Sequence, residues 1–146
     1  MDKERQVTMT VPAQAEFVDL IRLTLYGVAS KMKFSFEEIE DMKVAVSEAV
    51  NNAVLHAYKG TDGEIHVTFM MDEDRLSIQV RDHGASFIPA DNLESASLHG
   101  KSIDEIQSGG LGLYLMQALM DTVEMKQAGG TSVTLTKKRA RSEEIA

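Results

Sequence analysis

The stretch IEDMKVAVSEAVNNAVLHA (residues 39–57) decides the fold, because its apolar residues recur at helical spacing. On a helical wheel they form a single stripe, which we expect to face a sheet: Ile39, Met42, Val46, Val50, Ala53 and Ala57. Glu48 lies roughly opposite this stripe, while Asn52 and His56 follow at intervals of one turn. The helix therefore presents a line of polar groups along its flank.

Two asparagines interrupt an otherwise strong helix. Asn51 and Asn52 are poor helix formers, and positions where local preference is overridden are often functional. An amide oxygen suits Mg²⁺, which takes one or two protein oxygens and leaves other positions to water and phosphates. A carboxylate one turn earlier, at Glu48, can accept a proton from an attacking hydroxyl. The alternative is structural: exposed or back-bonding asparagines, and a His56 that is merely hydrogen-bonded at the edge of the core.

The elements around this helix follow from spacing and turn signals. Ser35 and Glu38 form a predicted capping box, so we expect the helix to run from residue 36 to about 58. The remaining predicted elements are a strand at 6–11, a helix from 13 to about 31, a turn at 60–63, a hairpin with strands 64–71 and 75–81, a long loop at 82–110, a helix from 112 to about 120, and strands at 122–127 and 132–136.

Helices and strands fall in blocks, and at least two hairpins are antiparallel. This arrangement predicts an α+β fold, a two-layer α/β sandwich with a mixed, mainly antiparallel sheet and helices on one face. A doubly wound parallel sheet does not fit it. We expect the methionines to lie in the core by default, among them Met70, Met71, Met116, Met120 and Met125.

Three glycine-bearing turns contain candidate binding residues. In Asp82-His83-Gly84, a carboxylate that follows a strand can accept a hydrogen bond from an exocyclic amine, although an ordinary turn also explains it. The run SGGLGL (108–113) leads into a helix, where backbone N–H groups can hold phosphate oxygens; a flexible hinge or cap is the alternative. A hairpin turn alone would explain Gly129-Gly130-Thr131.

Length and composition limit the classes of function. The chain has 146 residues, which fit one domain over 1–146, with a polar tail expected from about 137 to 146. A net charge of −8 disfavours direct nucleic-acid binding, so any role in transcription would act through a protein partner. The absence of cysteine fits a reducing cytoplasm, and we expect no thiolate metal site. Neither a signal peptide nor an apolar run of about 18 residues indicates a membrane.

Taken in order, these motifs resemble the Bergerat-fold (GHKL) ATPases, which include gyrase, Hsp90, histidine kinases and MutL. The resemblance rests on Glu48-Ala-Val-Asn-Asn52-Ala-Val-Leu-His56, Asp82-x-Gly84, Gly110-Leu-Gly112-Leu and Gly130-Thr131. Within this superfamily, IRLTLYGVASKM, IEDMKVAVSEAVNNAVLHAYK and GGLGLYLMQALMDTVE are similar to small bacterial serine-protein kinases that act as anti-sigma factors, above all the anti-sigma-B kinases. The similarity extends from Val11 to Thr136.

The resemblance implies a role for each matching residue. Glu48 would be the catalytic base and Asn52 the magnesium ligand, while His56 would support the helix. The implied ATP-binding residues are Asn52, Asp82, Gly84, Ser108, Gly109, Gly110, Gly112 and Thr131, with Asp82 and Thr131 at the adenine. Residues 87–108 would form the ATP lid. Here Asp104-Glu105-Ile106-Gln107 departs from related sporulation kinases, which carry an arginine just before the serine-glycine step, so Lys101 or a partner would have to supply any cation needed there.

The implied function is that of a cytoplasmic, homodimeric serine-protein kinase and anti-sigma factor. It would sequester a stress sigma factor of the sigma-B type and use ATP and Mg²⁺ to phosphorylate a serine of the anti-anti-sigma antagonist. The chain is too short to hold also the phosphoacceptor domain of a histidine kinase or the transducer domain of a gyrase. A non-catalytic, ATP-dependent partner-switching module and a purely structural interaction domain remain alternatives.

Overall fold

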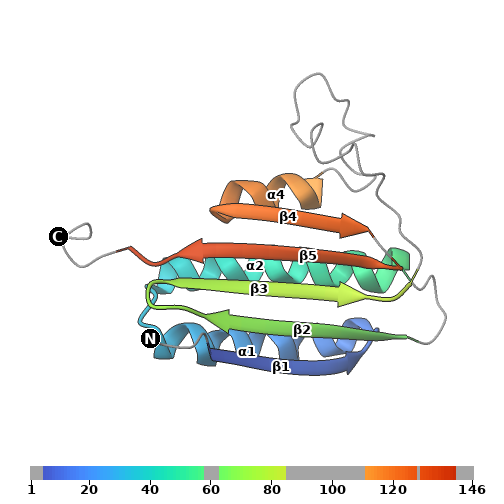
Figure 1. The fold of residues 1–146 in the computed structure, drawn as a ribbon, viewed down its shortest axis with the longest axis horizontal. Helices are drawn as coiled ribbons and strands as arrows, with labels where there is room; N and C mark the ends of the chain where they lie inside the picture. The colour runs from blue at the N-terminus through green and yellow to red at the C-terminus, as the bar shows by residue number, and fades with distance from the viewer. Residues whose placement is uncertain (1–4, 58–62, 85–110, 128, 141–146) are drawn as a thin grey trace, which may run out of the picture.

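A five-stranded sheet with helices on one face forms the framework of the molecule (Figure 1). The computed structural model describes residues 5–57, 63–84, 111–127 and 129–140. Its elements in chain order are β1 (Arg5–Pro12), the 3-10 turn η1 (Ala15–Phe17), α1 (Val18–Lys31), α2 (Phe36–Asn52), the π-helical turn η2 (Ala53–Ala57), β2 (Glu64–Met71), β3 (Arg75–Asp82), α4 (Leu111–Leu119), β4 (Thr122–Gln127) and β5 (Thr131–Lys138).

The strand order is β1-β2-β3-β5-β4, and each of these four neighbouring pairs is antiparallel. Helices α1, α2 and α4 lie on one face of the sheet (Figure 1). The predicted α+β two-layer sandwich is confirmed, and in the described part the sheet is antiparallel throughout. No helix in the described ranges is long and apolar enough to span a membrane.

The core lies between the helices and the inner face of the sheet. The predicted stripe of α2 faces it, since Ile39, Met42, Val46, Val50 and Ala53 are all buried; the side chain of Ala57 lies outside the described part. The strands contribute alternate residues to the core, as period-2 spacing requires. The largest fully buried side chains are Phe69, Ile21, Leu25, Met42, Ile65, Leu76, Ile78, Met116 and Leu135.

The methionine expectation holds for four of the five named residues. Met116, Met120 and Met125 are buried in the core, and Met71 packs against it. Met70 is the exception, because strand alternation turns it to the opposite face of the sheet from Phe69, where it is only half-buried.

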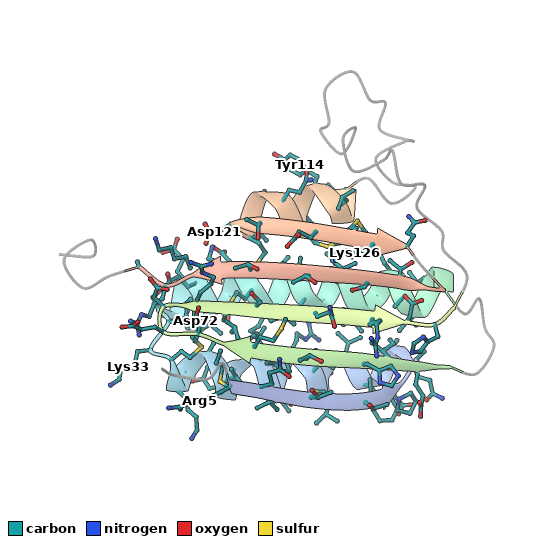
Figure 2. The ribbon with its side chains drawn as sticks, viewed as in Figure 1. Arg5, Lys33, Asp72, Tyr114, Asp121 and Lys126 are labelled. Atoms are coloured by element: carbon teal, nitrogen blue, oxygen red, sulfur yellow. The ribbon has the colours of Figure 1, made fainter. Side chains whose placement is uncertain are left out.

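The end of the sheet where β1 begins and β2 ends lies away from the carboxyl end of α2 (Figure 1). Arg5, Lys33 and Asp72 are found at this end (Figure 2). Here α1 ends in a Schellman motif, in which the Phe34 amide donates to Ala29 O (3.1 Å) and the Lys33 amide to Ser30 O (3.0 Å). Lys33 occupies the left-handed position of the motif, with φ of 65°.

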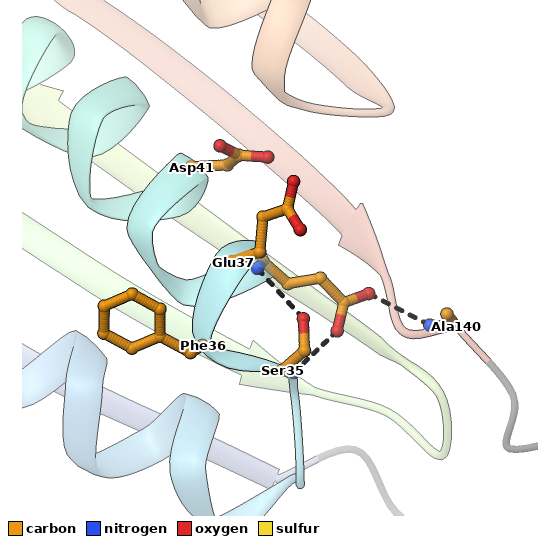
Figure 3. Close-up of a pocket in the computed structure, with 6 residues that line it drawn as sticks. Ser35, Phe36, Glu37, Asp41 and Ala140 are labelled. Carbon is orange, nitrogen blue, oxygen red and sulfur yellow. Dashed lines mark hydrogen bonds between the residues drawn. The ribbon is translucent and has the colours of Figure 1, made fainter. Parts of the chain in front are cut away.

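The amino terminus of α2 has the predicted capping box. The Glu38 amide donates to Ser35 Oγ (3.1 Å), and the Ser35 amide donates to Glu38 Oε1 (2.7 Å) (Figure 3). The second oxygen of Glu38 accepts a bond from the Ala140 amide (3.1 Å), so the cap also holds the end of the sheet (Figure 3).

The predicted start of the polar tail at about residue 137 is wrong. β5 continues to Lys138, and Lys137 Nζ donates to Leu119 O (2.6 Å). Beyond the strand, the Arg139 amide donates to Asp74 O (2.7 Å) and its guanidinium to Met32 O (2.8 Å). Lys137 and Arg139 thus satisfy carbonyl groups at the ends of neighbouring elements instead of lying in a polar tail. Residues 141–146 lie outside the described part, as do most of the predicted turn at 60–63 and residues 85–110 of the predicted loop.

Candidate functional site

The predicted site residues within the described ranges gather at one end of the molecule. Glu48 and Asn52 come from the last turns of α2, Asp82 from the end of β3, Thr131 from the start of β5, and Gly112 from the first turn of α4. Ser108, Gly109, Gly110 and the expected lid (87–108, with Lys101) lie outside the described residues. The described part of the site therefore consists of the end of α2, the adjoining ends of β3 and β5, and the start of α4.

Glu48 and Asn52 lie side by side against the start of α4. A methyl group placed on Gly112 would come 2.9 Å from Glu48 Oε2 and 3.7 Å from the Asn52 side-chain nitrogen. Both side chains are half-buried, because α4 packs along this flank of α2. The position opposite the apolar stripe is thus not simply exposed to solvent, and glycine at 112 leaves the space that the two polar groups occupy.

The α-helix ends at Asn52, six residues before the predicted end near residue 58. Ala53–Ala57 continue as a π-helical turn, a rare feature that is frequent at functional sites. The Ala53 amide bonds to both Ala49 O and Val50 O, so the transition begins beside the polar line. His56 belongs to this turn, but its side chain lies outside the described part, so its supporting role stays a prediction.

Asp82 is a buried carboxylate, with 4% of its surface exposed. Its Oδ1 accepts the backbone amides of Gly84 (3.0 Å) and Thr131 (3.4 Å), and it is the register partner of Thr131 across β3 and β5. Burial raises the pKa of Asp82, while the amides of Gly84 and Thr131 and the nearby His83 oppose the rise. Both amides reach the same oxygen, which leaves Oδ2 for a donor from a ligand.

Thr131 is the buried neighbour of Asp82, with 3% of its surface exposed. Its Oγ1 is buried and has no hydrogen-bond partner among the residues that the structure describes. An unpaired buried hydroxyl costs roughly 1–3 kcal/mol, so such a group calls for an explanation. A polar ligand edge that contacts both Asp82 and Thr131 would satisfy it, as adenine would.

Gly130 has a role that a hairpin turn does not explain. A methyl group there would lie 2.1 Å from the Asp82 carbonyl oxygen, so only glycine allows the β4–β5 turn to close on Asp82. Its φ of 132° also favours glycine. Sequence reasoning missed this contact, and also the edge-on packing of His83 on His66, whose ring centroids are 5.3 Å apart. The double glycine was the available signal for the first; no signal indicated the second.

The donor set fits magnesium with ATP. In the described ranges no three His, Cys, Asp or Glu side chains are grouped to hold one metal ion, but Mg²⁺ at a nucleotide needs only one or two protein oxygens. Asn52 carries an amide group one helical turn after Glu48, and an amide oxygen is a ligand of the type that Mg²⁺ accepts. The orphaned Thr131 hydroxyl and the buried Asp82 supply a separate polar surface of the kind that a purine edge requires.

Comparison with known proteins places the chain in a family. Residues 11–137 match the family described as "Histidine kinase-like ATPase domain". The chain is 51% identical to the serine-protein kinase RsbW of Bacillus pumilus, with 90% of this chain and 84% of the relative covered. It is 48% identical to RsbW of Bacillus subtilis over the same shares, and 44% identical to RsbW of Bacillus cereus, with 94% and 87% covered.

A solved structure supports the fold. The RsbU and RsbW domains of a Mycobacterium tuberculosis protein match with a TM-score of 0.68 at 23% identity, over 94% of this chain and 33% of the other. The relatives' names favour the kinase over the non-catalytic binding module and over a structural interaction domain. The chain belongs to the RsbW family of serine-protein kinases, within the histidine-kinase-like ATPases.

Proposed function

We propose that this kinase uses Glu48 as its catalytic base and Asn52 as its magnesium ligand, and that it acts as an anti-sigma factor. One observation above all supports the residue roles: Glu48 and Asn52 lie together against Gly112, at the amino terminus of α4. This places a proton acceptor, Glu48, and a metal ligand, Asn52, beside the start of a helix whose backbone amides suit a phosphate.

Asp82 and Thr131 bind the adenine in this proposal. Asp82 Oδ2 accepts a hydrogen bond from the exocyclic amine, and the Thr131 hydroxyl gains a partner that it does not have among the described residues. Gly84 keeps Asp82 oriented through its amide, and Gly130 permits the close approach of the two strands. Recognition by buried polar groups is selective, because a base without the matching group leaves them unpaired.

At the other side of the site, the amino-terminal amides of α4 are directed at the phosphates. The first amides of a helix have no partner within the helix and carry a partial positive charge. Gly112 belongs to this first turn, and we place Ser108, Gly109 and Gly110 before it in the same phosphate-binding run. A bound Mg²⁺ would neutralise phosphate charge and fix the geometry of the transferring group.

Glu48 accepts the hydroxyl proton of the substrate serine as the serine oxygen bonds to the terminal phosphorus of ATP, the bond from that phosphorus to the β-phosphate oxygen breaks, and ADP leaves. The carboxylate is half-buried and lies beside Asn52, so it can reach a hydroxyl that approaches between α2 and α4. Phosphoryl transfer needs little covalent chemistry from the protein, and positioning should therefore provide most of the rate enhancement.

The proposed partners are a sigma factor of the sigma-B type and its anti-anti-sigma antagonist. The family resemblance supports both, and the net charge of −8 fits a role through proteins rather than through direct nucleic-acid binding. A phosphate on the antagonist adds up to two negative charges, which would break its complex with this acidic kinase and free the kinase for sigma. We place the kinase in the cytoplasm as a homodimer.

The test is phosphotransfer from labelled ATP to a candidate antagonist, with the modified residue mapped. We expect label on one serine, and a loss of at least about 100-fold in Glu48→Gln. Binding of ATP and of sigma factor should survive in the same variant, because glutamine retains the size of the side chain. Unchanged transfer by Glu48→Gln would remove Glu48 from its role, and label on a residue other than serine would contradict the substrate class.

A further inference from the structure

A cavity lies at the opposite end of the molecule from Glu48 (Figure 1). Its volume is about 650 Å³, and it is lined by residues from the ends of four elements: Arg5, Lys31, Met32, Lys33, Met71, Asp72, Glu73 and Arg139. Arg75, at this end of β3, is seven residues from Asp82, roughly 23 Å along the strand. The cavity is therefore separate from the nucleotide site.

The lining is unusually cationic for this protein. Four cations face two carboxylates in a chain whose net charge is −8. The ion pairs between described residues are Arg22–Asp19, Lys43–Glu40 and Lys137–Asp41, and none includes a cation of this cavity. Arg5, Lys31 and Lys33 are also exposed. Their charges are thus available to a ligand.

Part of this cluster has a structural explanation. Lys31 lies in the last turn of α1, where a cation compensates the helix dipole, and Arg139 donates to Met32 O at the same helix end (2.8 Å). Arg139 still has further donors, since a guanidinium carries five N–H groups. Helix capping accounts neither for Arg5, which belongs to β1, nor for the residue type at position 33.

Lys33 is the most informative member of the cluster. It is the only non-glycine residue with positive φ in the described ranges. It occupies the left-handed position of a Schellman motif, where glycine or asparagine is usually found. Residues held in this region tend to occur at functional sites. A lysine at this position accepts backbone strain and places an ammonium group at the cavity.

We propose that Arg5, Lys31, Lys33 and Arg139 bind a carboxylate-rich segment of a partner protein. Two guanidinium groups match carboxylates in a two-pronged geometry, and the lysines add charge without a fixed direction. Met32 and Met71 offer apolar contact to the stems of acidic side chains. The cations lie at the ends of three elements, β1, α1 and β5, and this spread suits a peptide with spaced carboxylates better than one compact phosphate group.

The proposal is tested with the full chain and a fluorescently labelled hexaglutamate peptide, by anisotropy at low and high salt. We expect saturable binding that weakens as salt rises. Lys33→Gly should weaken binding roughly threefold to fivefold, and Arg5→Gln should act in the same direction. Because glycine suits the backbone at position 33, thermal melting of Lys33→Gly should be unchanged or higher, so any lost binding is not lost folding.

Lys126→Gln is the matched control, since it removes one positive charge from an exposed position on β4 at the other end of the sheet (Figure 2). The proposal predicts wild-type affinity for this variant. Equal weakening by Lys126→Gln and Lys33→Gly would show a general field effect and overturn the site. Absence of saturable binding, or displacement of the peptide by an equal concentration of inorganic phosphate, would also overturn the assignment to carboxylates.

Discussion

The two ends of α2 follow opposite rules. At Ser35 the helix begins with a complete capping box, and Glu38 also accepts the amide of Ala140. At Asn52 the α-helix passes into a π-helical turn, and Glu48 and Asn52 remain half-buried beside Gly112. At the first end, the capping box satisfies the backbone groups of the helix. At the second end, Glu48 and Asn52 occupy half-buried positions where nonpolar side chains would make the protein more stable.

This difference indicates that the amino-terminal end of α2 stabilises the fold, whereas its carboxyl end serves the reaction. Substitutions at the capped end should change the free energy of unfolding and leave phosphotransfer intact. Substitutions at the other end should abolish or reduce function and leave stability unchanged, or raise it. Variants at the two ends therefore test whether the separation is real.

The largest expected effect comes from Asp82→Asn at the nucleotide end. Asparagine Oδ1 can still accept the amides of Gly84 and Thr131, but the second position becomes a donor and no longer accepts from adenine. ATP affinity measured by calorimetry should fall roughly 100-fold or more. Unchanged affinity would remove Asp82 from the adenine site.

The stability of the same variant relative to the wild type should depend on pH. Because burial raises the pKa of Asp82 above 3.8, the folded wild type binds this proton more tightly than the unfolded chain does. The ionised carboxylate therefore destabilises the folded state at neutral pH. This destabilisation disappears as the pH falls through the folded pKa toward 3.8. In urea denaturation without ATP, Asp82→Asn should have a higher free energy of unfolding than the wild type at neutral pH. This difference should shrink as the pH falls. A gain that grows in acid would contradict the direction of the shift.

An intermediate effect is expected for Gly112→Ala. The new methyl group would meet Glu48 Oε2 at 2.9 Å, so the carboxylate must rotate away. Phosphotransfer should fall about 10- to 100-fold, since small misplacements of a reacting group are costly. Stability should not fall, because alanine is the better helix former and the end of a side chain can move.

Gly27→Ala is the control for this substitution. Gly27 lies in α1, and a methyl group there would meet nothing within 4 Å. It should gain up to about 1 kcal/mol of stability without any change in phosphotransfer. A similar loss of rate in both variants would show that Gly112 does not act through Glu48.

The smallest effect belongs to the capped end. Ser35→Ala removes the acceptor of the Glu38 amide and should cost about 1 kcal/mol of stability. For a chain of this size that corresponds to a fall in Tm of about 2–4 °C. The kcat and the ATP affinity should equal those of the wild type. A marked loss of activity would contradict the separation between the two ends of α2.

Local patterns were sufficient for most of the fold. The stripe from Ile39 to Ala53, the capping box at Ser35 and the alternation of β2 and β3 each predict their element, because neighbours in sequence determine it. One boundary error falls where tertiary contacts extend an element, as in β5, which continues to Lys138 beside β3. Another falls where α2 passes into the π-helical turn after Asn52 and so ends earlier than its pattern predicts. Arg139, which was predicted to lie in a polar tail, instead makes hydrogen bonds to Met32 and Asp74.

The candidate site could be predicted only as a set of separate residues. Spacing on one helix puts Glu48 near Asn52, but no local rule brings Gly112 to them or closes Gly130 on Asp82. These contacts join segments that are 48 or more residues apart, and they depend on the sheet order and on how α4 packs on α2. The family resemblance supplied that information, and the left-handed Lys33 had no signal in the sequence at all.

The most direct test of the account is calorimetric titration of ATP, with and without Mg²⁺, into wild type and Asn52→Ala. We expect tight, magnesium-dependent binding by wild type and at least about 100-fold weaker binding by Asn52→Ala, because the variant loses its metal ligand. The melting temperature of the variant should be no lower, because alanine is the better helix former at the position where α2 ends. Equal binding by the two proteins, or no binding by wild type, would contradict the claim that this end of α2 holds the ATP–magnesium site.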